Sequence, residues 1–170
     1  VEDYESNLWL ACHKYGLVRL GKNGSYKHFT HNHGDTSSIM SNNVNTIFQD
    51  TKGNLWVGTE GSGLGVLNIK TGKILRIYSE QEGMPSNTIY SVQEDHEGNI
   101  WVTTGGGLVR IANGNRTIST FKYIEEQLRF NYSHNSSLFS RKGMLYYGGS
   151  TGMLTFLPRS VVTGGNKGKI

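Results

Sequence analysis

The chain has 170 residues with a formal net charge of +4, and its 23 Gly, 2 Pro and 11% aromatic residues predict an all-β protein rich in tight turns. Its basic residues are scattered, which argues against nucleic-acid binding, and a single cysteine excludes an intrachain disulfide. No apolar run approaches 18 residues, so we expect no direct membrane insertion.

Four related segments follow one another along the chain, near residues 3–20, 50–69, 95–111 and 141–157. Each carries an aromatic residue at the same place: Trp9, Trp56, Trp101 and Tyr146. These residues are separated by 47, 45 and 45 positions. A period near 45 residues is typical of one four-stranded blade of a β-propeller.

The order of elements is the same within each copy. Runs at 44–49 and 88–94 predict first strands, and each is followed by Asp-x-x-Gly, with Asp50 and Gly53 in one copy and Asp95 and Gly98 in the next. Asp suits the start of a tight turn because its side chain accepts a backbone N–H, and Gly suits the left-handed position. Second strands are then expected at 54–59 and 99–104, third strands at 64–69 and 108–111, and a fourth at 74–78.

The second strand is apolar on both faces, since Leu55 and Val57 alternate with Trp56. A strand enclosed between two sheets has this pattern, whereas a strand with one wet face does not. We therefore interpret the repeated tryptophans as blade core rather than as sugar-stacking platforms. The predicted fold is an all-β β-propeller of four-stranded antiparallel blades, with about three and a half to four blades over 1–159 and a linker or disordered tail over 160–170.

The repeats resemble the two-component regulator propeller family. Residues 42–64 follow its pattern closely, and residues 87–108 do so with Thr103 in place of the usual glycine. In the first copy Ser6 replaces the turn glycine. Residues 143–149 and 152–158 resemble the last blade of such propellers. The resemblance implies the C-terminal part of a larger propeller, and because a seven-bladed ring needs roughly 300 residues or more, the blade count also favours a fragment. Closure as a small four-bladed ring is the alternative.

That family forms the ligand-sensing periplasmic part of hybrid two-component sensor histidine kinases of the Bacteroides type. The resemblance therefore implies a non-catalytic segment that responds to an oligosaccharide or another small molecule and signals across the inner membrane. It also implies three partners: the remaining blades, a following immunoglobulin-like domain, and a second copy of the parent protein in a homodimer. No cofactor is implied.

Ligands of propellers often bind at the loops after the second strands. Here these loops contain His13, Lys14, Tyr15 and Glu60, which carry polar or aromatic groups where a turn needs none. We take these four residues as candidate ligand contacts. The alternative is that they are simply exposed turn residues.

A metal site is the second possibility considered. His28, His31, His33 and Asp35 have ligand side chains, but they lie in an irregular polar loop, which favours a solvated loop. We therefore predict no metal, and no Ser-His-Asp set or other catalytic residue is identifiable. Two functional alternatives remain open: a streptogramin-lyase-like propeller enzyme, and a structural scaffold for protein partners.

Overall fold

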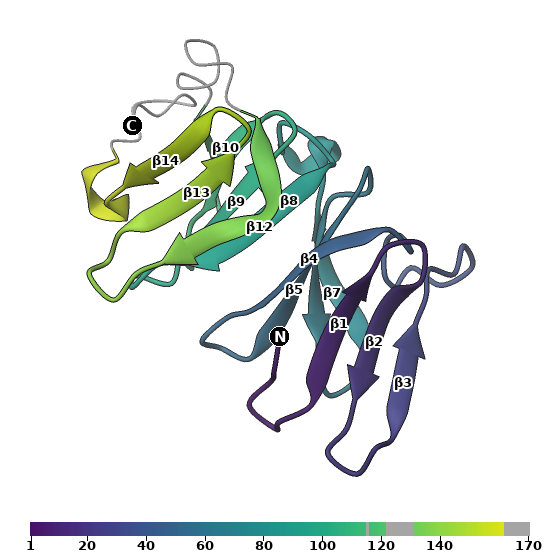
Figure 1. Cartoon of the computed structure of the whole chain (residues 1–170). Helices are drawn as coiled ribbons and strands as arrows, with labels where there is room; N and C mark the ends of the chain where they lie inside the picture. The colour runs from purple at the N-terminus through teal and green to yellow at the C-terminus, as the bar shows by residue number, and fades with distance from the viewer. Residues whose placement is uncertain (115, 122–130, 162–170) are drawn as a thin grey trace.

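The computed structural model describes residues 1–114, 116–121 and 131–161, which form four antiparallel sheets in succession (Figure 1). The first sheet contains β1 (Leu8–Cys12), β2 (Gly16–Leu20) and β3 (Tyr26–Phe29). The second contains β4 (Val44–Gln49), β5 (Asn54–Thr59), β6 (Leu64–Asn68) and β7 (Lys73–Tyr78). The third contains β8 (Ile89–Glu94), β9 (Ile100–Thr104), β10 (Gly107–Ile111) and β11 (Ile118–Phe121). The fourth contains β12 (Tyr132–Phe139), β13 (Leu145–Gly149) and β14 (Gly152–Phe156).

Each sheet is a simple meander in which consecutive strands pair. The second and third sheets are complete four-stranded blades, and β5 spans the residues expected for it. By alignment with the repeat, the first sheet has the last three strands of a blade and the fourth sheet has the first three. The all-β propeller prediction is confirmed, with four sheets of three or four strands.

The turn between the first two strands of a blade is built by the Asp-x-x-Gly motif. Asp50 Oδ1 accepts hydrogen bonds from the backbone N–H groups of Lys52 at 3.0 Å and Asn54 at 2.8 Å. Gly53 adopts a φ of 82° and Gly98 a φ of 76°, in the left-handed region where a side chain causes strain. In the first copy Ser6 occupies the corresponding position, with a φ of 59°.

The same aspartate also binds the repeated tryptophan. Asp Oδ2 accepts a hydrogen bond from the indole Nε1 six residues later in three copies: Asp3 and Trp9 at 2.8 Å, Asp50 and Trp56 at 2.9 Å, Asp95 and Trp101 at 2.7 Å. All six residues are buried. The bond satisfies the polar edge of a large apolar ring inside the core.

The fourth copy lacks this pair. Ser140 stands where the aspartate would be, and its Oγ accepts the backbone N–H of Met144 at 3.1 Å. Tyr146 replaces the tryptophan and is only half-buried. A hydroxyl can close the turn, but it does not reach a ring on the next strand.

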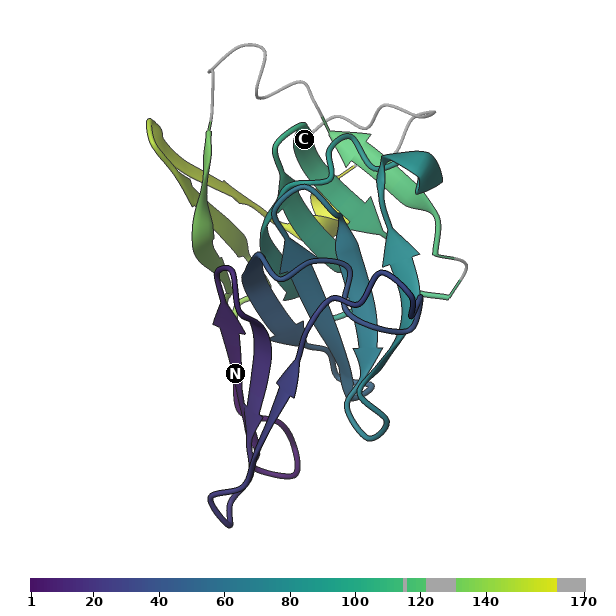
Figure 2. The same cartoon turned by 90° about the vertical axis from the view of Figure 1, so that its right-hand side faces the viewer.

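The apolar core lies between the sheets. Trp9 packs with Leu55 and Val57 of the second sheet, and Trp56 packs with residues of the third sheet in the same manner. Trp101 packs with Leu145 and Tyr147 of the fourth. The innermost strands β4, β8 and β12 lie next to one another. Figure 1 shows the sheets spread out in succession, and in Figure 2, turned by 90°, they overlap.

Close packing between the inner strands explains why one repeat position holds Gly58 in the second sheet and Thr103 in the third. A Cβ at Gly58 would lie 2.5 Å from Thr46 Cγ2 and 2.7 Å from Ile89 Cγ2, so only glycine fits there. Thr103 occupies the corresponding place in the third sheet, opposite Ser91, and the two hydroxyl oxygens are 2.6 Å apart in a hydrogen bond. A smaller partner thus makes room for the larger residue.

The two ends of the series have uncovered apolar faces. On the first sheet Leu8, Leu10 and Leu20 are 37% to 43% exposed, and on the fourth sheet Leu138 and Met153 are 58% and 62% exposed. In Figure 1 the first and fourth sheets lie at opposite ends of the series. Among the described residues, no further sheet covers either face.

Two 3₁₀ helices complete the described structure, at Glu80–Glu82 and Pro158–Ser160. Val161 is buried against the fourth sheet, so packing extends two residues beyond 159. The rest of the expected tail, 162–170, lies outside the described residues. Within the described part of the chain, no helix has the length and apolar character needed to cross a bilayer.

Candidate functional site

Irregularities in the innermost strands bring together a group of polar and aromatic side chains. Pairing shifts between Val44 and Thr46 of β4, and between Ile89 and Ser91 of β8, so Asn45 and Tyr90 are the unpaired residues. In β12 the register shifts between Tyr132 and Ser137, a stretch that contains His134 and Asn135. Such bulges redirect side chains and are frequent beside functional sites.

Side chains from these bulges contact one another across three sheets. Asn135 Nδ2 donates to the Asn45 backbone oxygen at 2.9 Å, and Asn45 Nδ2 donates to the Ile89 backbone oxygen at 3.3 Å. The rings of Tyr90 and His134 meet edge to face, with centroids 4.9 Å apart. We call Asn45, Tyr90, His134 and Asn135 the inner-strand cluster.

The cluster retains polar groups for a ligand. Among the described contacts, the Oδ1 atoms of Asn45 and Asn135 accept no hydrogen bond, and the Tyr90 hydroxyl forms none. His134 and Asn135 are exposed, whereas Asn45 and Tyr90 are half-buried. Asn135 has a φ of 51°, a left-handed conformation that asparagine tolerates better than most residues. The arrangement offers amide and hydroxyl groups beside an aromatic face.

The loops predicted to contact ligand lie at the end of the second sheet where the inner-strand cluster also lies. The His13 Nε2 and Glu60 Oε2 atoms are 3.2 Å apart, joining the first sheet to the second. Asn43 holds both loops, because its Oδ1 accepts the Lys14 backbone N–H at 3.1 Å and its backbone oxygen accepts the Glu60 N–H at 3.0 Å. Asn43 is two residues before Asn45 of the inner-strand cluster.

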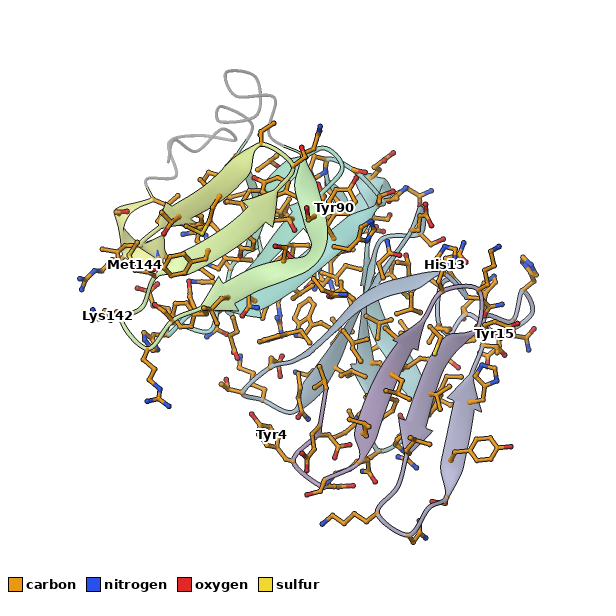
Figure 3. All side chains as sticks on the ribbon, in the orientation of Figure 1. Tyr4, His13, Tyr15, Tyr90, Lys142 and Met144 are labelled. Atoms are coloured by element: carbon orange, nitrogen blue, oxygen red, sulfur yellow. The ribbon has the colours of Figure 1, made fainter. Side chains whose placement is uncertain are left out.

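Of the four predicted contacts, the structure therefore brings His13 and Glu60 together and places Lys14 beside them. Lys14 has a φ of 70°, so its conformation is set by the turn. The Tyr15 side chain is 71% exposed, and its backbone oxygen is bonded to His28 Nε2. Figure 3 shows His13 and Tyr15 at the loop end of the first sheet and Tyr90 near the start of β8.

The polar loop considered as a metal site has internal contacts of its own. The rings of His31 and His33 meet edge to face at 4.6 Å, and His31 Nδ1 is 2.8 Å from the Ile39 backbone oxygen. In the part of the chain that the structure describes, no three His, Cys, Asp or Glu side chains gather as metal ligands would.

The inner-strand cluster was missed by sequence reasoning. A bulge inserts one residue and so shifts the alternation of the strand by one position, as between Val44 and Thr46, but a single shift within so short a strand is a weak signal in the sequence pattern. Asn45 and Tyr90 do stand 45 residues apart, at the same repeat position, yet they differ in chemistry. The available signal was this one repeat position, at which the residue type changes between copies while the flanking residues stay similar.

Four consecutive meander sheets, packed face to face with β4, β8 and β12 as the innermost strands, define a partial β-propeller. Residues 38–61 and 83–106 match the family model described as the two component regulator propeller. Two segments of the chain are therefore similar to repeats of this family.

Solved structures share this fold. A crystal structure of the extracellular domain of a hybrid two-component system from B. thetaiotaomicron is 24% identical, with a TM-score of 0.79 over 94% of this chain and 22% of that one. A second structure of that domain is 25% identical, with a TM-score of 0.77 over 94% and 23%. This chain thus spans less than a quarter of the length of those domains.

The fold is shared more widely. Virginiamycin B lyase from Staphylococcus aureus is 15% identical, with a TM-score of 0.67 over 98% of this chain and 55% of the lyase chain. At this identity the likeness concerns the fold alone. No curated protein sequence matches the chain.

Proposed function

We propose that this chain is a non-catalytic segment of a ligand-sensing propeller in a bacterial hybrid two-component sensor. The observation that carries the proposal is the pair of family repeats on a fold shared with an extracellular sensor domain. We place it in the periplasm, where it responds to an oligosaccharide and contributes to signalling across the inner membrane. The remaining blades, an immunoglobulin-like domain and a second copy of the sensor are its proposed partners.

The inner-strand cluster supports an oligosaccharide as ligand. Sugars present hydroxyl groups that donate and accept hydrogen bonds, and their C–H faces pack on aromatic rings. Asn45 and Asn135 offer carbonyl oxygens, while Tyr90 and His134 offer ring surfaces from neighbouring sheets. His13 and Glu60 add an exposed imidazole and an exposed carboxylate, 3.2 Å apart, at the nearby loops.

A conformational output follows from the position of the cluster between blades. A ligand that contacts β4, β8 and β12 together binds best to one relative arrangement of these sheets. It therefore shifts the population toward that arrangement by its differential affinity. In the proposed sensor, this shift changes the geometry of the dimer.

The test is the thermal stability of the full-length protein against a panel of plant and host oligosaccharides. Binding to the native state must raise the unfolding temperature in a saturable way. We expect a shift with one glycan class, and we expect His134→Ala and Tyr90→Phe to weaken that glycan at least tenfold. Tyr26→Ala, which removes a 75% exposed ring on β3, is the control and should bind normally.

The variants also separate the two sets of candidate contacts. If His13→Ala, Tyr15→Ala and Glu60→Ala weaken the glycan while the cluster variants do not, the loops are the site and the inner-strand cluster is structural. No shift with any glycan would overturn the oligosaccharide proposal. It would favour a non-glycan ligand or a scaffold for protein partners.

A further inference from the structure

A concave site lies between the third and fourth sheets, at the opposite end of the sheets from the inner-strand cluster. It is a pocket of about 260 Å³ beside the two Asp-x-x-Gly-type turns. Figure 3 shows Lys142 beyond the end of β12, whereas Tyr90 of the inner-strand cluster lies near the start of β8. The pocket is therefore separate from the site proposed above.

The junction between the second and third sheets shows a filled form of this position. Between the second and third sheets, Glu94 at the end of β8 accepts two hydrogen bonds from Thr51, from its backbone N–H at 2.7 Å and its hydroxyl at 2.8 Å. Lys52 Nζ donates to Asn113 Oδ1 at 2.6 Å beside them. Polar side chains thus tie this junction together.

The junction between the third and fourth sheets departs from that arrangement. Forty-five residues later, His96 stands in the place of Thr51 and Phe139 in the place of Glu94. Their rings meet edge to face with centroids 4.7 Å apart, and His96 also lies over Gly143, close to where a Cβ would be. An aromatic wall replaces the hydrogen bonds and leaves the pocket open.

Two cations border this wall. Lys142 and Arg159 line the pocket, are exposed, and form no salt bridge or side-chain hydrogen bond with any described residue. Leu157 and Pro158 add apolar surface next to Phe139. Free cations beside an aromatic and aliphatic wall are suited to a carboxylate attached to a ring.

Two acidic residues, Asp95 and Glu97, line the other wall of the pocket, and their carboxylates differ in how many hydrogen bonds they already accept. Asp95 is buried, and its carboxylate already accepts hydrogen bonds from the Glu97 and Asn99 backbones, the Asn99 side chain and Trp101. Glu97 is exposed and accepts one bond from Asn99 Nδ2 at 3.3 Å. The other carboxylate oxygen of Glu97 can accept a hydrogen bond from a hydroxyl group of a ligand. The wall with Lys142 and Arg159 therefore favours an anionic group, and the wall with Glu97 favours a hydroxyl group of the same molecule.

We propose that this pocket binds a small ring-bearing carboxylate, with the carboxylate on Lys142 and Arg159 and the ring against Phe139 and Pro158. A sugar carboxylate and an aromatic carboxylate both have this combination of a ring and a carboxylate group. Two probe pairs distinguish these sources: glucuronate against glucose, and benzoate against benzyl alcohol.

The experiment is titration of the intact protein with the four probes, followed by ligand-observed nuclear magnetic resonance. We expect saturable binding of at least one carboxylate and at least tenfold weaker binding of its neutral counterpart. Lys142→Met and Arg159→Gln should each weaken the carboxylate by roughly tenfold, because each removes a charge-assisted hydrogen bond. Lys22→Met, which removes an exposed cation on a distant turn, should have no effect.

Both variants alter exposed side chains, so unchanged unfolding temperatures will confirm that they fold. Equal binding of carboxylate and neutral probes, or full binding by Lys142→Met and Arg159→Gln, would overturn the proposal, as would no binding of either carboxylate. Because the probes and variants differ from those used for the inner-strand cluster, failure here leaves the proposed sensor function standing.

Discussion

Trp56 Nε1 donates a hydrogen bond to Asp50 Oδ2 at 2.9 Å, and both residues are buried. Replacing Asp50 with alanine leaves the indole N–H and the Asn54 amide without their acceptor inside the fold. We expect Asp50→Ala to lower the free energy of unfolding by about 3 kcal/mol, measured by urea denaturation. Glu5→Ala removes an exposed acid from the equivalent turn of the first copy and should change stability by less than about 0.5 kcal/mol. Similar losses in both variants would contradict the structural role of the bond.

The Asp3 carboxylate should make stability depend on pH. Burial raises the pKa of Asp3, but hydrogen bonds from Asn7 and Trp9 together outweigh this and leave it below the ordinary value of 3.8. The folded state therefore favours the charged form, so this stabilisation is complete above the ordinary pKa and is lost as the pH falls through the folded pKa. The stability difference between wild type and Asp3→Asn should shrink between about pH 6 and about pH 2. A difference that stays constant over this range would show that the carboxylate charge is not involved.

The Tyr147 hydroxyl is buried and has no hydrogen-bond partner among the described residues. Burial raises its pKa well above the ordinary value, so the group stays neutral. Tyr147→Phe should leave stability unchanged or raise it by up to about 1 kcal/mol, because it removes a buried hydroxyl without a partner and keeps the apolar ring. Tyr147→Leu should instead cost about 2–4 kcal/mol, since the ring stacks on Phe156. A clear loss with phenylalanine would mean that the hydroxyl is bonded.

Gly58 is required by contact rather than by backbone conformation. A Cβ there would meet side chains of Thr46 and Ile89 at 2.5 Å and 2.7 Å. We expect Gly58→Ala to destabilise the fold by about 1–3 kcal/mol through overpacking, measured as a lowered midpoint of denaturation. Gly34→Ala is the control, because its added carbon would lie 3.6 Å from Asn32 and touch nothing else. Equal tolerance of both changes would show that the inner strands can separate without cost.

The contact between His13 and Glu60 should contribute little to stability. Both side chains are about half exposed, at 55% and 53%, and exposed pairs are worth less than about 1 kcal/mol. Glu60→Gln should therefore unfold at nearly the wild-type denaturant concentration. This makes any loss of ligand response in loop variants interpretable as a binding effect. A large loss of stability would show instead that these loops hold the first two sheets together.

The fold could be predicted closely because local chemistry repeats. Asp50 and Gly53 fix a turn, Trp56 fixes the buried strand after it, and the same set recurs 45 residues later. The hydrogen bond between Asp50 and Trp56 was not foreseen, although the constant six-residue separation in three copies is visible in the sequence. A hydrogen bond between a turn side chain and a ring on the following strand depends on rotamers and on the depth of the ring in the core, which spacing does not specify.

The sites could be predicted only in part. The loops with His13 and Glu60 can be located from the sequence, because polar residues interrupt a regular repeat, and their contact with a ligand stays a prediction. The pairing of Tyr90 with His134 depends on bulges and on which blades become neighbours, so it requires the tertiary structure. The exchange of Thr51 and Glu94 for His96 and Phe139 can be read by aligning the copies, but its meaning depends on the two positions facing each other across a junction.

Each apolar cluster spans two adjacent sheets, and none of the three includes residues from three sheets. Apolar coupling in such an array therefore acts mainly between neighbouring sheets, although the bond from Asn135 to Asn45 also joins the fourth sheet to the second. The second and third sheets have a coupling on both sides, whereas the first and fourth have one each. Amide hydrogens should therefore exchange fastest in the first and fourth sheets and slowest around Trp56. Local unfolding is then expected to start at the two end sheets and to proceed toward the middle of the segment.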